Sequence, residues 1–184
     1  MQSPDSLRMM VFAALMAALI AIGAFVAVPI GPVPIVLQNF FVLLAGMLLG
    51  SRWGLISVGV YLAAGACGLP VFAGGSGGLG HLIGPRGGYL FGYLPAVWVI
   101  GWIAERGGGK AAWEVIGMAI GSLLVYTVGV PWLGWMLNLE WPKALAVGMY
   151  PFLIGDALKI AAAVPVVRSL RPLIRTHAMK AEHA

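Results

Sequence analysis

Two oppositely charged residues, Asp156 and Lys159, stand inside a long apolar segment that covers residues 145–170. A spacing of three residues places both side chains on one face of a helix, near enough to interact. A charged side chain at membrane depth costs about 2.5–3.5 kcal/mol on insertion scales. The pair is therefore expected to be either a structural ion pair or, as we favour, an acceptor and a donor for a polar group of a ligand.

A glycine-rich segment, residues 69–87, is the second candidate for ligand binding, and Gly78 lies at its centre. Glycine at this density lets the backbone approach a ligand closely or adopt positive φ. Arg86 follows in a stretch that is otherwise almost free of charge. An arginine at the head of a helix can attract a carboxylate, although contact with a lipid headgroup is the alternative.

Uncharged polar and aromatic residues add further candidates. Gln38 and Asn39 offer hydrogen-bond donors and acceptors just inside an apolar segment. Four aromatic residues gather near residues 132–150, where they form either an interfacial belt or a wall over a ligand. They are Trp132, Trp135, Trp141 and Tyr150.

Catalytic motifs in the glycine-rich segment match only in part. Gly74-x-Ser76-x-Gly78 has the spacing of a nucleophile elbow, but the strand-to-helix turn that this motif requires is not evident. An intramembrane serine protease, the alternative from a different class, needs a histidine base, and only His81 lies near Ser76. No GxxxxGK[ST] sequence occurs, so the chain has no P-loop, and we expect no enzyme and no cofactor.

Composition indicates the solvent in which these residues must be positioned. Of 184 residues, 61% are hydrophobic and 9% are charged, whereas soluble domains carry about 25% charged residues. The chain is therefore predicted to be a single membrane-embedded domain, residues 1–184. The net charge of +5 does not indicate nucleic-acid binding, because most Lys and Arg residues lie between or after the apolar segments. The single cysteine excludes an internal disulfide.

Apolar segments of suitable length predict an all-α membrane protein, a bundle of six transmembrane helices. The first is read as a helix because it is too long for the apolar part of a signal peptide. The expected helices cover residues 7–28, 35–50, 53–68, 88–104, 111–136 and 145–170.

The positions of Lys and Arg predict that both termini are cytoplasmic. Eight basic residues then lie inside, namely Arg8, Arg52, Arg106, Lys110, Arg168, Arg171, Arg175 and Lys180. Only Arg86 and Lys143 lie outside, apart from Lys159 within the last helix. The connections at 29–34, 69–87 and 137–144 consequently meet on the outer face, which indicates a site open to the outside.

Alanines recur at four-residue spacing in the first helix, in two adjacent rows. One row is Ala13, Ala17 and Ala21, and the other is Ala14 and Ala18. Small residues on one face let another helix approach closely. The rows predict either packing within the bundle or a docking face for a partner.

Four sequence runs together resemble the BioY family, the substrate-binding S components of biotin transporters of the energy-coupling-factor type. The runs are PVPIVLQN (32–39), GLPVF (68–72), GPRGGYL (84–90) and GDALK (155–159). The similarity extends over nearly the whole chain. It implies a six-helix bundle in a prokaryotic cell membrane, with biotin as the transported ligand.

The resemblance also implies roles for individual residues. Asp156 would accept from an N–H of the ureido ring, Lys159 or Gln38 would donate to its carbonyl, and Arg86 would meet the carboxylate. Phe72 and Tyr89 would pack on the apolar parts of biotin. The helix-1 alanines would dock onto an energy-coupling module made of a transmembrane subunit and two ATPase subunits. A different vitamin as ligand and self-association of the chain stay open at this stage.

Overall fold

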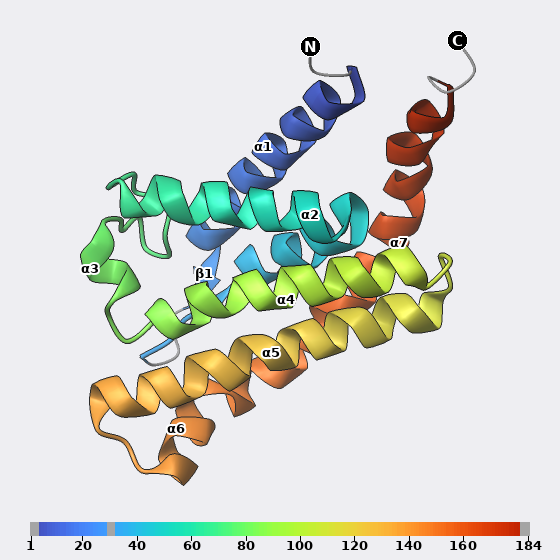
Figure 1. Ribbon diagram of the computed structural model, residues 1–184. Helices are drawn as coiled ribbons and strands as arrows, with labels where there is room; N and C mark the ends of the chain where they lie inside the picture. The colour runs from blue at the N-terminus through green and yellow to red at the C-terminus, as the bar shows by residue number, and fades with distance from the viewer. Residues whose placement is uncertain (1–3, 29–31, 181–184) are drawn as a thin grey trace.

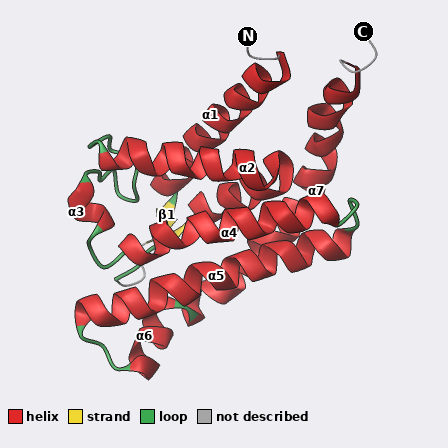
Figure 2. Cartoon of the chain, in the orientation of Figure 1, coloured by secondary structure: helices red, strands yellow, loops and turns green. Residues whose placement is uncertain are grey.

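The computed structural model describes residues 4–28 and 32–180, and these residues are mainly helical (Figures 1 and 2). The helices are α1 (Pro4–Phe25), α2 (Gln38–Ala66), α3 (Leu79–Leu82), α4 (Gly87–Arg106), α5 (Ala111–Leu137), α6 (Trp141–Gly148) and α7 (Tyr150–Lys180). Five stretches within them are long and apolar enough to cross a membrane, namely Ser6–Phe25, Gln38–Ala66, Gly87–Arg106, Ala111–Leu137 and Trp141–Ile174. The prediction of an all-α chain with several helices long and apolar enough to span a membrane is confirmed.

Helix α2 contains both the second and the third helix that the sequence predicts. Its two halves meet at Gly50, which has φ 79° and ψ −176°. Only glycine adopts this backbone conformation without strain. Glu105 fixes the bend because its Oε1 accepts from the Ser51 backbone N–H at 2.7 Å and from the Ser51 hydroxyl at 2.9 Å. The break therefore lies at Gly50 and not at residues 51–52 as expected.

A short β-ribbon stands where the sequence predicted the end of the first helix and the start of the second. Strand β1 (Ala27–Val28) pairs antiparallel with β2 (Ile35–Val36). The expected first helix, 7–28, thus ends at Phe25, and the expected start of the second at residue 35 is wrong by three residues. Pro32 and Pro34 favour extended backbone before α2, which explains the late start.

The connection between α5 and the last long helix is itself helical. Asn138 ends α5 in the left-handed conformation, with φ 49°. Pro142 lies in the first turn of α6, where a missing N–H is tolerated. The last long helix starts at Tyr150, five residues later than the expected residue 145. The expected loop at 137–144 is therefore shorter, because α6 occupies its second half.

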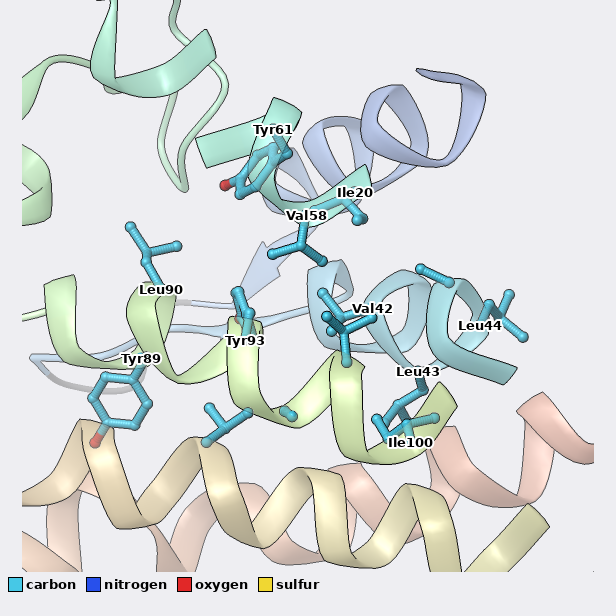
Figure 3. Packing of buried hydrophobic residues seen from close by; sticks show 14 of the residues in the cluster. Ile20, Val42, Leu43, Leu44, Val58, Tyr61, Tyr89, Leu90, Tyr93 and Ile100 are labelled. Atoms are coloured by element: carbon cyan, nitrogen blue, oxygen red, sulfur yellow. The ribbon is translucent and has the colours of Figure 1, made fainter. Parts of the chain in front are cut away.

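Glycines allow the long helices to pack closely, with α4 lying between α2 and α5 (Figure 1). A Cβ at Gly92 would lie 3.1 Å from the Val125 Cα, and one at Gly101 would lie 2.2 Å from the Ser51 N. A side chain at either position would push the neighbouring helix backbone away. The apolar core gathers around α2 and α4 and includes Val42, Val58, Tyr93 and Ile100 (Figure 3).

The two alanine rows of α1 face different surroundings. Ala13 and Ala17 are only 2% and 6% exposed, because α1 packs along α2. Ala14 and Ala18 are exposed, and Ala21 is half-buried. This corrects the expectation that both rows belong to a docking face: Ala13 and Ala17 belong to the core, and the free row is Ala14 and Ala18.

Most of the charged contacts gather at one end of the bundle. There, Arg8 Nη2 donates to the Leu173 carbonyl at 3.0 Å and Arg171 Nη1 to the buried Glu114 carboxylate at 2.5 Å. Arg168 lies 3.4 Å from the other Glu114 oxygen. The chain ends lie toward this end as well (Figure 1). The β-ribbon, α3 and α6 lie at the opposite end of the long helices.

Candidate functional site

Asp156 and Lys159 form the expected ion pair on α7. Lys159 Nζ lies 3.3 Å from Asp156 Oδ1, and the two side chains are only 11% and 7% exposed, respectively. The Tyr126 hydroxyl from α5 donates to Oδ2 of the same carboxylate. Both carboxylate oxygens are therefore held, one by a cation and one by a neutral donor.

Two small cavities adjoin each other between α2, α4, α5 and α7, and each has a volume of about 40 Å³. Both are lined by Val33, Pro34, Val36, Tyr89 and Tyr93. The first also contacts Gln38, Ala73, His81, Arg86 and Leu90. The second also contacts Asn39, Tyr126, Phe152 and Lys159. The shared wall indicates one elongated site with two chemically different ends.

The volume of this site is small for a ligand. Pockets for drug-sized molecules measure roughly 300–1,000 Å³. The two cavities are therefore smaller than a typical ligand pocket. Residues 33–36 lie against both cavities and enter α2 directly.

Arg86 stands at the end of the site opposite Lys159, at the head of α4. Its Nε donates to the Pro32 carbonyl at 3.0 Å and thereby ties the chain before β2 to the glycine-rich segment. Arg86 and His81 also line an outer hollow of about 390 Å³, together with Pro32, Gly80, Gly84, Pro85 and Leu137. Arg86 and His81 line both the hollow and the inner cavity and therefore lie between the two.

His81 lies on α3 and is held in place. Its Nδ1 is 2.9 Å from the Ser76 hydroxyl, and its ring stacks on Phe72 with 5.1 Å between centroids. Burial lowers the pKa of His81, and the positive charge of Arg86 lowers it further. A protease base must become an imidazolium, and this cation neighbour opposes that step. The Ser76–His81 contact therefore does not support the protease alternative.

Tyr89 lines both cavities, and its contact with a ligand stays a prediction. Its hydroxyl donates to the Gly148 carbonyl at 2.8 Å, which fixes the ring between α4 and the end of α6. A Cβ at Gly129 would lie 2.5 Å from the ring, so the glycine makes room for it. The hydrogen bond and the close packing therefore hold the Tyr89 ring in one orientation.

Phe72 and Gly78 line neither cavity. Phe72 is fully buried and contacts the Tyr61 ring edge-to-face at 5.6 Å between centroids. Gly78 has φ 88°, and its N–H donates to the Gly65 carbonyl at 2.7 Å. Both residues hold the glycine-rich segment against α2, and direct contact of either with a ligand stays a prediction.

The aromatic residues near 132–150 were expected to form either an interfacial belt or a wall over a ligand. Trp132 Nε1 donates to the Gly84 carbonyl at 2.9 Å and so links α5 to the glycine-rich segment. Trp135, Trp141 and Tyr150 are 72%, 58% and 57% exposed, as residues of an interfacial belt would be. None of these four residues contacts either inner cavity in the described part of the chain.

Sequence reasoning missed Tyr126 and Tyr93. The Tyr93 hydroxyl donates to Asn39 Oδ1, just as Tyr126 donates to Asp156. A buried tyrosine hydroxyl usually finds a partner, so tyrosines in apolar helices were a usable signal. Their partners lie on other helices, however, and helix spacing does not identify them.

The family comparison decides the identity. The model of the BioY family matches residues 1–176 of the chain. The chain belongs to the BioY family. The resemblance found in the four sequence runs is thus confirmed.

Relatives within the BioY family match almost end to end. "Biotin transporter BioY" of Thermotoga maritima is 39% identical over 167 residues, which cover 91% of this chain and 98% of the relative. "Probable biotin transporter BioY" of Pyrococcus horikoshii is 40% identical and covers 86% of this chain and 93% of its own length.

A solved structure has the same fold. The crystal structure of the S-component for biotin from an ECF-type ABC transporter superimposes with a TM-score of 0.86 at 36% identity. The match covers 93% of this chain and 94% of the other.

Proposed function

We propose that this chain is the biotin-capturing S component of an energy-coupling-factor transporter. The family and its named biotin transporters support this function and agree with the expectation that the chain is not an enzyme. The observation that carries the proposal at residue level is the elongated site, with Lys159 at one end and Arg86 at the other. Asp156 lines neither cavity itself, but its carboxylate lies 3.3 Å from Lys159 Nζ.

The chemistry of biotin matches the two ends of the site. Its ureido ring carries two N–H donors and one carbonyl acceptor. Asp156 accepts from a ureido N–H, and Lys159 donates to the carbonyl. Arg86 binds the carboxylate at the end of the valerate chain. The formal charges of these three residues sum to +1, which complements a monoanion.

The middle of the site suits the apolar part of biotin. Tyr89 and Tyr93 line both cavities, and Phe152 adds a ring beside Lys159. Hydrogen bonds to charged groups contribute about 1.5–3 kcal/mol each. A few of them in a site shielded from water therefore support tight capture.

The bundle is multi-pass in a prokaryotic cell membrane, with both termini cytoplasmic. The two halves of α2 count as separate crossings in this arrangement, which gives six. The basic residues near the chain ends support the orientation, because such residues are retained on the cytoplasmic side. The elongated site then opens outward through the hollow beside Arg86.

The sequence contains no P-loop, so ATP hydrolysis that drives import would have to come from a partner. The partner is an energy-coupling module with a transmembrane subunit and two ATPase subunits. We assign its contact to the exposed row of α1, Ala14 and Ala18, where small side chains permit close helix approach. ATP-driven reorientation of the bundle would then open the site inward.

An equilibrium biotin titration of the detergent-solubilised protein tests the function. Asp156→Asn and Lys159→Ala should each weaken binding at least tenfold, because each removes a charge-assisted hydrogen bond. Lys143→Ala is the matched control, since Lys143 is an exposed lysine on α6. Unchanged affinity in both site variants would remove the assignment of the ion pair. A purified protein that retains a different vitamin by mass spectrometry, and no biotin, would overturn the function itself.

A further inference from the structure

Gln38 carries a buried side-chain NH2 group that has no acceptor among the described residues. It is the first residue of α2 and is only 2% exposed. Its Nε2 makes no hydrogen bond within the described part of the chain. Buried polar groups are nearly always paired, and Gln38 lines the cavity that contains Arg86 and His81. Nε2 carries two N–H donors, and at least one of them is available to an acceptor that enters this cavity.

Tyr61 lies beside Gln38 and is equally buried. It projects from the second half of α2, above Leu90 and Tyr93 of α4 (Figure 3). Its hydroxyl is close enough to the Gln38 side chain to interact, but the two do not form a hydrogen bond of regular geometry. A small rotation of either group would complete that bond. Tyr61 can then hold the amide in one orientation.

Tyr61 also connects Gln38 to the outer segment. Its ring contacts Phe72, and Phe72 stacks on His81 beside Arg86. The positions of Tyr61 and of the Arg86 end of the site are therefore coupled through packed rings. This contact series explains why a fully buried Phe72 lies within a segment otherwise rich in glycine.

We propose that Gln38 Nε2 donates to the ligand carboxylate together with Arg86, and that Tyr61 is the positioning residue for Gln38. The proposal rests on the proposed function and assigns Gln38 to the carboxylate end of biotin. The sequence-based expectation was different, since it offered Gln38 to the ureido carbonyl. The position of Gln38 favours the carboxylate, because Gln38 shares its cavity with Arg86, whereas Lys159 lines the other cavity.

Paired titrations with biotin and biotin methyl ester test the assignment of Gln38. Gln38→Met keeps the length of the side chain and removes the amide. It should weaken biotin binding about tenfold and methyl ester binding less than threefold, because the ester lacks the anionic acceptor. Lys159→Ala is the matched control and should weaken both ligands alike, since the ureido ring is common to them.

A double-mutant cycle tests the role of Tyr61. Tyr61→Phe should weaken biotin binding about fivefold in the native background and less than twofold in the Gln38→Met background. A purely structural role would instead lower the thermal unfolding midpoint and act equally in both backgrounds. Additive effects would overturn the positioning role.

Equal losses for biotin and its ester in Gln38→Met would overturn the carboxylate assignment. If that variant does not yield folded protein, Gln38→Asn, which withdraws the amide by one carbon, replaces it. The same comparison is then made between the loss of affinity for biotin and the loss for the methyl ester. A native protein that does not bind biotin at all would contradict the proposed function, and this result is separable from both outcomes.

Discussion

The Tyr126 hydroxyl donates to one carboxylate oxygen of Asp156, thirty residues further along the chain, while Lys159 holds the other oxygen. The contact joins α5 to α7 inside the bundle. A carboxylate fixed by two donors presents its remaining lone pairs in a defined direction. The orientation of the Asp156 carboxylate therefore depends on a residue from a different helix.

Tyr126→Phe should weaken biotin binding about tenfold, because Asp156 loses a donor that keeps it oriented. A hydrogen bond to a charged group contributes about 1.5–3 kcal/mol, enough for an effect of this size. The measurement is an equilibrium titration in detergent. Tyr150→Phe serves as control, since Tyr150 is 57% exposed. Equal affinity of Tyr126→Phe and the native protein would show that Lys159 alone positions the carboxylate.

The two alanine rows of α1 should respond differently to a large side chain. Ala18→Trp adds bulk on an exposed position, so folding and biotin binding should persist while co-purification with the energy-coupling module is lost. Ala17→Trp forces bulk into a site that is 6% exposed. Overpacking of this kind costs about 1–3 kcal/mol or more, and the thermal unfolding midpoint should fall. An Ala18→Trp protein that still co-purifies with the module would remove this row from the interface.

Acidification should lower the stability of the folded protein through protonation of His81. Burial and Arg86 lower its pKa in the folded state, whereas an unfolded chain titrates near its ordinary value of about 6.5. The unfolded state therefore binds the proton more readily, and stability decreases as pH falls below about 6.5. The thermal unfolding midpoint should drop more between pH 7.5 and 5.5 in the native protein than in His81→Gln. The same drop in both proteins would assign the effect to other groups.

Sequence alone determined the features that depend on local spacing. The Asp156–Lys159 contact follows from a separation of three residues on a helix. The membrane-spanning stretches follow from apolar length, because lipid requires the backbone to satisfy its own hydrogen bonds. The position of Arg86 at the head of α4 was also expected, since this residue directly precedes a predicted helix.

The tertiary structure decided which distant residues meet. Tyr126 beside Asp156, Gln38 in the Arg86 cavity and the bend at Gly50 against Glu105 all depend on how helices pack. The same packing buried Ala17 and left Ala18 exposed, although both alanines have identical local spacing. Helical periodicity defines the faces of a helix, but only its neighbours determine which face is covered. For that reason the polar pair could be identified from the sequence, whereas its tyrosine partner and the exposed alanine row could not.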